Sequence, residues 1–526
     1  MMSEKKRVAS AAGVISAATL CSRILGYIRD MVFAGLFGAG PVSDAFIAAF
    51  RIPNLLRRLF GEGSLSISFI PVFSEFYTRY GKDEAYRLAR SALRLLSAVL
   101  VIAVLLGVLF SPWIVRAIAW GFGDSGVKFS MTVTLTRIMF PYVYFIGVLA
   151  LAMGILNVRG HFAAPALAPV FLNLAMIGCL LLVSRFSDNA TIRIYGLAIG
   201  VVVGGVLQLG LQVPFLLKQG FYFWQKATFY HPGLKNIGRL FLPAIFGSAV
   251  LQINTLLGTL LASFQAEGSV TYLYFADRLV QFPLALFGIA TATAVMPSFS
   301  RQMTAGDVTA VRETFEYAMR LVFFITIPSM VGLIILREPI IALLFQRGAF
   351  SFEATRLTAQ ALLYYTIGLW AFSAVRIVVN TFYAMQEIWT PVRLAVISIA
   401  ANLVLGIILM KPMGHAGLAL AVSLASALHL GLLIRALRFR LDRLGLTKIV
   451  TSVCRATLGS MLMGLAVWMV AKTIIVDEFE TSGGLFWGVV GSIFTGLVVY
   501  GSFAFIMKSP EIEKVFKITR ERVWKK

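Results

Sequence analysis

The sequence has little charge, cysteine or histidine, and each shortage excludes a class of protein. Of its 526 residues, 13% are charged and 59% are hydrophobic, whereas a soluble domain carries about 25% charged residues. The three cysteines, Cys21, Cys179 and Cys454, lie far apart in apolar segments, so neither a disulfide framework nor a metal cluster is expected. The four histidines are scattered and show no metal-ligand spacing.

Catalytic and processing motifs are missing as well. The chain has no GxxxxGK[ST] phosphate loop, so it carries no ATP hydrolysis site of its own, and no HExxH zinc motif. We therefore predict that it is not an enzyme. The first apolar stretch contains Arg23, Arg29 and Asp30, which is untypical of a cleavable signal peptide and indicates a mature first helix.

Long apolar runs are what the sequence does contain. Mean hydropathy is +0.85, and apolar runs of about 20 residues, enough to cross a bilayer as a helix, recur along the chain. We predict an all-α polytopic membrane protein with about fourteen transmembrane helices. The expected spans are 10–36, 42–72, 86–110, 129–156, 163–184, 192–217, 238–263, 269–297, 315–336, 355–381, 390–410, 413–436, 449–472 and 484–507.

The formal charge of +23 is concentrated in alternate loops and at both ends. Basic clusters occur at 5–7, 79–90, 218–235, 435–443 and 508–526. Cytoplasmic loops of membrane proteins are rich in Lys and Arg, so both termini and these loops are predicted to be cytoplasmic. The basic tail then faces anionic lipid headgroups, and no nucleic-acid partner is expected.

An internal repeat, offset by about 226 residues, divides the chain. The segment FIPVFSEF around Pro71 recurs as VMPSFSRQ around Pro297, Pro112 matches Pro339, and the apolar helices after Pro71 and Pro297 also align. The repeat predicts an N-lobe at 1–217, a cytoplasmic linker at 218–235, a C-lobe at 236–440, and an added helix pair with a basic tail at 441–526. Two six-helix lobes of equal orientation are typical of secondary transporters with a site between the lobes.

Several ionisable residues fall inside the predicted spans. Each costs at least about 2.5–3.5 kcal/mol at bilayer depth, so such residues normally face a cavity or a partner. They include Arg23, Arg29 and Asp30 in the first span, Asp44, Arg51, Arg57, Arg58 and Glu62 in the second, Arg137 in the fourth, Asp277 and Arg278 in the eighth, and Arg376 in the tenth. Arginine suits a phosphate-bearing ligand because its planar fork donates two parallel hydrogen bonds. Pairing with the nearby aspartates, or snorkelling to headgroups, is the alternative.

Several segments resemble the MurJ (MviN) lipid II flippases, within the multidrug/oligosaccharidyl-lipid/polysaccharide exporter superfamily. The resemblance is carried by CSRILGYIRD (21–30), SDAFIAAFRIPNLLRRLFGEGSLSISFIP (43–71), NVRGHFAAPALAPVFLN (157–173) and YFADRLVQFP (274–283). It implies a bacterial inner-membrane transporter that moves the undecaprenyl-pyrophosphate-linked peptidoglycan precursor outward by alternating access, in cell-wall biogenesis and cell-shape maintenance.

The resemblance also implies roles for individual residues. It places substrate binding on Arg23, Arg29, Arg57 and Arg278, and supporting or gating roles on Asp30 and Asp44. Arg51 and Asp277, singled out as charged residues inside predicted spans, are assigned supporting or gating roles as well. The last two helices would form a groove for the lipid tail, and cell-wall synthesis proteins are possible partners. Some members are described as binding sodium through a helix-7 carboxylate. Segment 236–266 has no Asp or Glu, which argues against sodium coupling, and no cofactor or metal is expected.

Other functions remain open at this stage. The chain could export another lipid-linked oligosaccharide, such as an O-antigen or teichoic-acid precursor. A cation or drug antiporter is disfavoured, because its cavity should be acidic rather than rich in arginine. A polytopic glycosyltransferase would need a long loop with paired carboxylates, which the chain lacks, and a scaffold would not need buried arginines.

Overall fold

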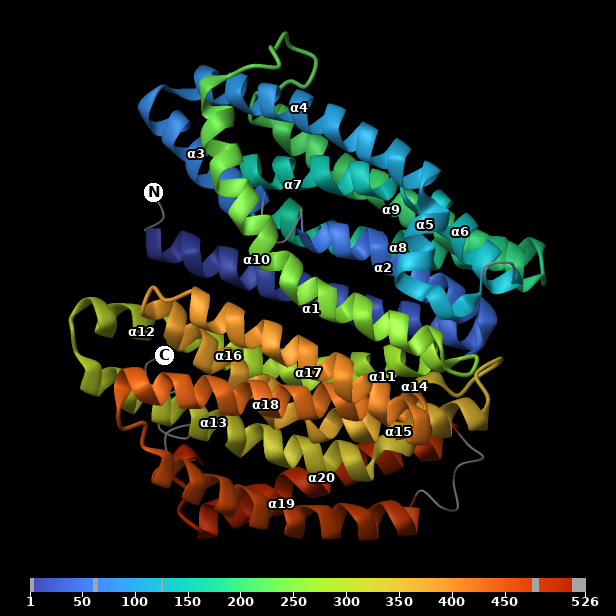
Figure 1. The fold of residues 1–526 in the computed structure, drawn as a ribbon, viewed down its shortest axis with the longest axis vertical. Helices are drawn as coiled ribbons and strands as arrows, with labels where there is room; N and C mark the ends of the chain where they lie inside the picture. The colour runs from blue at the N-terminus through green and yellow to red at the C-terminus, as the bar shows by residue number, and fades with distance from the viewer. Residues whose placement is uncertain (1–3, 60–64, 124–125, 475–481, 513–526) are drawn as a thin grey trace. The chain divides into compact units, whose positions relative to one another are not determined.

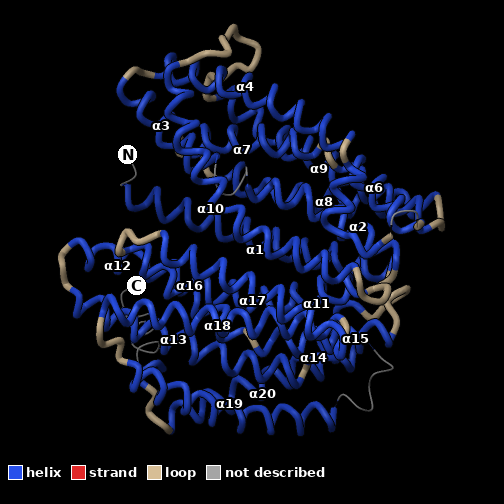
Figure 2. Tube along the Cα trace, in the orientation of Figure 1, coloured by secondary structure: helices blue, strands red, loops and turns tan. Residues whose placement is uncertain are grey.

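The structure is a computed structural model that describes residues 4–59, 65–123, 126–474 and 482–512. Side chains are not described for 4–12, 246–251 and 482. The described residues contain helices and no strand, and Figure 2 shows these helices joined by loops. The predicted all-α class is therefore confirmed.

Each predicted span falls on one helix or on a broken pair. The single helices are α1 (Glu4–Phe37), α4 (Lys82–Leu109), α8 (Ala163–Phe186), α9 (Ala190–Lys218), α10 (Pro232–Ser263), α13 (Val308–Ile335), α17 (Trp389–Met413), α18 (His415–Leu441), α19 (Leu446–Ile474) and α20 (Ser482–Ile506). The broken pairs are α2 (Pro41–Leu59) with α3 (Leu65–Arg79), α6 (Val127–Met139) with α7 (Tyr142–Val158), α11 (Ser269–Pro283) with α12 (Ala290–Thr304), and α15 (Phe352–Ile367) with α16 (Leu369–Ala384).

Proline and glycine mark most of these breaks. Pro141 separates α6 from α7, and a π-helical segment, Leu284–Ile289, follows Pro283. Gly368 lies between α15 and α16, which are bent by 41°. Proline removes a backbone donor and its ring clashes with the preceding turn, so a helix bends or ends there. Pro53 is different, because α2 continues through it, and residues 60–64 lie outside the described chain.

By length and composition alone, fewer than fourteen of the described helices could cross a membrane. Among the described residues, ten helices are long and apolar enough to cross a membrane, or eleven if α15 and α16 form one span. Helices α1 and α2 carry the charged residues that the sequence placed in the first two spans. The exact number of fourteen spans stays a prediction.

The helices form two compact units, Met1–Val270 and Thr271–Lys526. In the first, α8 packs against α9 and α1, while α3, α4 and α7 enclose a core that contains Phe69, Phe73 and Tyr86. Helix α10, which the repeat assigns to the C-lobe, packs against α3 and the short helix α5 (Ser111–Ala119). In the second unit, α13, α16 and α18 enclose a core around Phe315 and Phe382. The lobe boundaries at 217 and 236 stay a prediction.

The repeat predicted from the sequence is visible in the helix boundaries. Helix α13 begins 226 residues after α4, α17 begins 226 residues after α8, and α14 (Arg337–Phe345) begins 226 residues after α5. Helices α19 and α20 follow the last repeated helix, and α19 packs along α13 in the second unit (Figure 1). The structure thus contains two repeated sets of helices and an added C-terminal pair.

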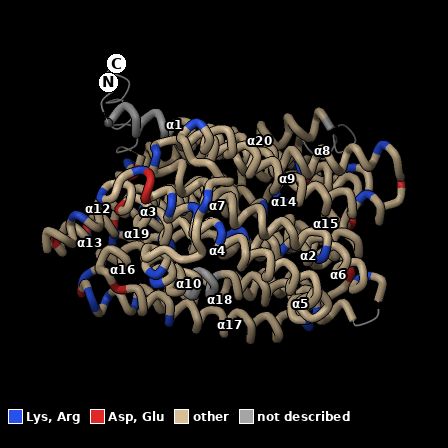
Figure 3. The backbone as a smooth tube through the Cα atoms, turned by 90° about the horizontal axis from the view of Figure 1, so that it is seen from above, with Lys and Arg blue, Asp and Glu red and all other residues tan. Residues whose placement is uncertain are grey.

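Charged residues avoid the middle of most helices. Figure 3 draws the middle of α17 without charged positions, and its sequence has no charged residue between Arg393 and Lys411. Helix α1 is one of the exceptions, because Arg23, Arg29 and Asp30 lie in its second half. A charged residue inside a membrane span needs a partner or a polar cavity, so the surroundings of these three residues are a candidate functional site.

Candidate functional site

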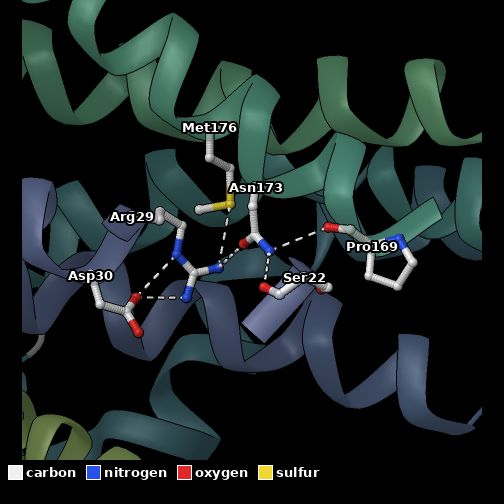
Figure 4. Close-up of polar contacts among 6 residues, drawn as sticks. All are labelled: Ser22, Arg29, Asp30, Pro169, Asn173 and Met176. Carbon is white, nitrogen blue, oxygen red and sulfur yellow. Dashed lines mark hydrogen bonds and ion pairs between the residues drawn. The ribbon is translucent and has the colours of Figure 1, made fainter. Parts of the chain in front are cut away.

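Arg29 and Asp30 form a buried ion pair on α1. Arg29 Nε and Nη2 both donate to Asp30 Oδ1, at 3.0 and 2.6 Å, and the two residues are 7% and 2% exposed. Arg29 Nη1 donates to Asn173 Oδ1 on α8 at 3.2 Å (Figure 4). A buried charge is tolerated only where hydrogen bonds and an opposite charge compensate it, and all three contacts do so here.

Asn173 in turn holds α8 against α1. Its Nδ2 donates to the backbone carbonyl of Ser22 at 3.1 Å and to that of Pro169 at 3.3 Å, and the Met176 sulfur lies 3.8 Å from Arg29 Nη1 (Figure 4). The Asn173 amide is therefore hydrogen-bonded both to the backbone of α1 and to the Arg29 guanidinium. The sequence offered one weak signal for this role, an asparagine inside an apolar helix within the block 157–173. Its pairing with Arg29 could not be predicted from the sequence.

Arg23 lies on the same helix in a different environment. It is exposed, and no hydrogen bond or ion pair of its side chain is found among the described residues. Seven residues separate it from Asp30, which places both side chains near one stripe of α1. The helix therefore carries one compensated arginine and, about two turns earlier, one whose charge is available to an anion.

Asp44 joins three segments of the first unit. It lies in the first turn of α2 and is 1% exposed, and its Oδ2 accepts from Lys128 Nζ on α6 and from the backbone N–H of Gly268, each at 2.8 Å. The Lys128 ammonium also lies 4.2 Å from the centroid of the Phe122 ring. Asp44 thus has a clear structural role, and Lys128 is a partner that the sequence reasoning missed, because nothing in its spacing marks it.

The arginines in the second half of α2 are less buried. Arg57 Nε and Nη2 donate to Asn54 Oδ1, each at 3.1 Å, which orients the guanidinium along its own helix. Arg51 and Arg57 are both partly exposed. Helix α2 thus presents two partly accessible arginines in the same unit as Arg23 and Arg29.

In the second unit, Asp277 and Arg278 lie in the middle of α11. Asp277 is exposed and accepts from Gln281 Nε2 at 3.4 Å, and Arg278 is partly exposed with its guanidinium 5.8 Å from the centroid of the Tyr274 ring. Asp277 is thus far more accessible than Asp30 in the first unit. Among the described residues, no group of three or more His, Cys, Asp or Glu side chains is placed to hold a metal ion.

Comparison with known proteins identifies a relationship over most of the chain. The family profile described as "Lipid II flippase MurJ" matches residues 33–488. A protein of Vibrio cholerae serotype O1, named "Probable lipid II flippase MurJ", is 37% identical over 515 residues, covering 95% of both chains. One of Burkholderia cenocepacia, named "Lipid II flippase MurJ", is 36% identical over 430 residues, covering 81% of this chain and 83% of its own.

Solved structures agree. A structure titled "Lipid II flippase MurJ, inward closed conformation" superposes with a TM-score of 0.80 at 29% identity, covering 95% of this chain and 99% of its own. An inward-facing multidrug resistance MATE transporter of the MOP superfamily superposes with a TM-score of 0.67 at 16% identity over 83% of this chain, which shows a shared fold. The chain therefore belongs to the MurJ family of lipid II flippases.

Proposed function

We propose that this protein moves lipid II, the undecaprenyl-pyrophosphate-linked peptidoglycan precursor, from the inner to the outer leaflet of the bacterial plasma membrane by alternating access. The observation that carries the proposal is the match, over 95% of the chain, to relatives and to a solved structure named as lipid II flippases. The fold shared with MATE transporters supports alternating access, because solved MATE structures of this fold include an inward-facing and an outward-facing conformation. Export of another lipid-linked oligosaccharide is the second candidate.

We propose further that Arg23, Arg29, Arg57 and Arg278 bind the substrate and that Arg23, Arg29 and Arg278 hold its pyrophosphate. The two roles on α1 differ: Arg29 is fixed by Asp30 and Asn173, so its guanidinium is preorganised, whereas Arg23 is exposed and can meet an anion directly. Preorganised donors lose little side-chain entropy when the ligand arrives. Asp30, Asp44, Arg51 and Asp277 support these arginines, and a groove beside α19 and α20 takes the lipid tail.

The membrane potential supplies the driving force in this proposal. It is worth about 2.3 kcal/mol per elementary charge per 100 mV, so an inside-negative potential favours outward movement of a dianionic headgroup. Sodium coupling is not part of the proposal, because α10 carries Gln252 and Asn254 and no carboxylate. Replacing sodium by potassium in a transport assay should leave the rate unchanged.

The protein is proposed to lie in the bacterial inner membrane with both termini in the cytoplasm, consistent with the basic clusters at its ends and alternate loops. Cell-wall synthesis proteins that use lipid II on the outer side are the proposed protein partners. No catalytic step is assigned to the chain.

The direct test is lipid II translocation in cells that depend on this protein. On its depletion, lipid II should become resistant to a lipid II-cleaving enzyme added outside, and re-expression should restore cleavage. Native mass spectrometry of the purified protein separates the two candidate substrates by the mass of the bound lipid. Retention of a lipid-linked oligosaccharide without the peptidoglycan disaccharide-peptide, together with unchanged lipid II cleavage, would replace lipid II by the second candidate.

A further inference from the structure

The linker between α9 and α10, residues 219–231, is fastened to the first half of α4. Figure 2 draws it as a long loop between two helices of the first unit. The contacts are Glu84 with His231 at 3.0 Å, the Tyr86 hydroxyl to the Gln219 carbonyl at 2.9 Å, Arg90 to Gln225 at 2.5 Å, and Arg94 to the Ala227 carbonyl. Because the contacts are spread along the linker, its path and the facing of its side chains are fixed.

The fixed linker has two faces. Phe221 is fully buried against Tyr86, and Phe223 packs on the same core. The alternating residues Tyr222 and Trp224 point outward, with their ring centroids 5.4 Å apart. Phe221 is buried and Phe223 partly buried, whereas Tyr222 and Trp224 are exposed, so the core contacts of the phenylalanines leave the tyrosine and the tryptophan on the outer side.

The outward face combines large aromatic rings with positive charge. Trp224, Phe229 and Tyr230 are 71%, 63% and 79% exposed, and Lys226 is exposed between them. Residues 218–240 include four basic side chains and no Asp or Glu. We call the exposed set Tyr222, Trp224, Lys226, Phe229 and Tyr230 the linker patch.

We propose that the linker patch binds anionic phospholipids at the headgroup level of the membrane surface. Helix α9, which is long and apolar enough to cross a membrane, ends at Lys218, and α10, which contains the predicted span 238–263, begins at Pro232. The patch therefore lies within a few residues of the end of α9 and of the start of α10. Tyrosine and tryptophan are enriched at this level because one end of each ring is apolar and the other polar. Lysines near an anionic surface add attraction that a zwitterionic surface does not supply. The proposal rests on the membrane fold and does not require lipid II transport.

The experiment uses the full chain in nanodiscs of phosphatidylcholine, with or without phosphatidylglycerol. Lipids brominated near the headgroup or near the chain end quench tryptophan fluorescence at their own depth. Since the chain has eight tryptophans, the signal of Trp224 is the difference between the unchanged protein and Trp224→Phe. We expect that signal to be quenched by bromine near the headgroup, and more strongly when the brominated lipid is phosphatidylglycerol.

A charge variant tests the anionic preference. Lys226→Gln in the patch, combined with Lys235→Gln at the exposed Lys235 in the first turn of α10, should lower the preference for phosphatidylglycerol by about fivefold for each lysine. The matched control is Lys411→Gln at the end of α17, which removes an exposed lysine outside the patch and should leave the preference unchanged.

Two results would overturn the proposal. Quenching of Trp224 by aqueous acrylamide but not by brominated lipid would place the patch in water, as a surface for a soluble protein. Equal quenching by the two lipid classes would remove the anionic preference. Neither result depends on lipid II, so both are distinguishable from failure of the proposed transport function.

Discussion

At the scale of single residues, Arg23 and Arg29 should respond differently to the same substitution. Arg29→Ala leaves the Asp30 carboxylate, 2% exposed, without its ion-pair partner, and breaking a buried pair costs about 3–5 kcal/mol. We expect lower membrane abundance of Arg29→Ala and recovery in Arg29→Ala with Asp30→Ala. Immunoblots of isolated membranes measure this.

Arg23→Ala should keep normal abundance and lose activity. A charge-assisted hydrogen bond contributes about 1.5–3 kcal/mol, so substrate affinity should fall by about one to two orders of magnitude. Arg23→Lys keeps the charge but not the two-pronged geometry and should be partly active. Arg278→Ala should behave like Arg23→Ala, because its neighbour Asp277 is exposed. If Arg278→Ala lost abundance and Asp277→Ala restored both abundance and activity, Arg278 would be a structural residue.

The Asp44–Lys128 pair gives a second prediction. Asp44→Asn and Lys128→Gln each remove one charge of a 2.8 Å ion pair whose carboxylate is 1% exposed. Each should lower the thermal midpoint in detergent, and the double variant should lose less than the two single losses combined, because the single changes strand a charge. Additive losses would show that the two side chains do not interact. Glu75→Gln, in the exposed pair with Arg79, is the control and should cost little.

The residue scale also shows what the sequence could and could not predict. Charge inside an apolar run singled out Arg29, Asp30 and Asp44, because a charge at bilayer depth is costly unless it has a partner or faces a polar cavity. Their partners Asn173 and Lys128 lie 144 and 84 residues away, and no periodicity connects them. The spacing of Arg23 and Asp30 predicted a shared direction on α1, but not that one would be exposed and the other buried, since burial depends on neighbouring helices.

At the scale of helices, the added pair α19–α20 distinguishes the two repeats. Leu105 and Leu109 on α4 are 64% and 66% exposed. Their repeat equivalents on α13, Val331 and Ile335, pack against α19 at Gly464 and are only partly exposed. The chain segment after α20 is held by Glu511, 2% exposed, which accepts from Arg320 on α13 at 2.8 Å and from Ser452 on α19 at 3.0 Å.

This contact predicts the effect of Arg320→Ala. Removing the guanidinium leaves the buried Glu511 carboxylate without its counter-charge, which should lower the free energy of unfolding of the second unit by about 3–5 kcal/mol. The second unit should therefore unfold at a lower temperature. Glu511→Gln should cost less, since a neutral amide needs no counter-charge. Thermal unfolding followed by tryptophan fluorescence separates the two variants. Equal losses of thermal stability in Arg320→Ala and Glu511→Gln would show that the negative charge of Glu511 does not determine the cost of removing Arg320.

The turn between α16 and α17 predicts a pH dependence. Hydrogen bonds from Thr390 and Arg440 lower the pKa of Glu387, although burial opposes them. A carboxylate whose pKa is lower in the folded state contributes stability above its unfolded pKa, about 4.3, and loses it as pH falls through the lower folded value. Glu387→Gln should therefore reduce stability slightly at pH 7 and have no effect at the acidic end. The thermal midpoints of the unchanged protein and of Glu387→Gln, measured from about pH 3 to about pH 7, give this difference in stability.

At the scale of the whole molecule, the charge distribution predicts the topology. Cysteines introduced at Lys82 and Lys226 should resist a membrane-impermeant thiol reagent added outside intact cells, whereas one at Glu267 should react. All three positions are exposed. Cys21 and Cys454 are exposed as well, so the background must lack native cysteines. Labelling at 82 or 226 without permeabilisation would contradict the proposed orientation.

The repeat was the part of the whole that the sequence predicted best. Matching prolines located it because proline constrains the backbone wherever it occurs, and helix boundaries reproduce the offset. The packing of α10 with α3 and α5 in the first unit was not predictable, because a connecting helix with apolar residues on several sides gives no preference for either lobe.

The Arg320–Glu511 contact has a consequence for biosynthesis. The two residues are 191 positions apart, and ribosomes add about 5–20 residues per second. Arg320 is therefore added to the chain roughly 10–40 s before Glu511. Glu316, one turn earlier on α13 and 3.2 Å from Arg320, is available at once. The nascent chain thus carries a temporary counter-ion for Arg320 until Glu511 is translated.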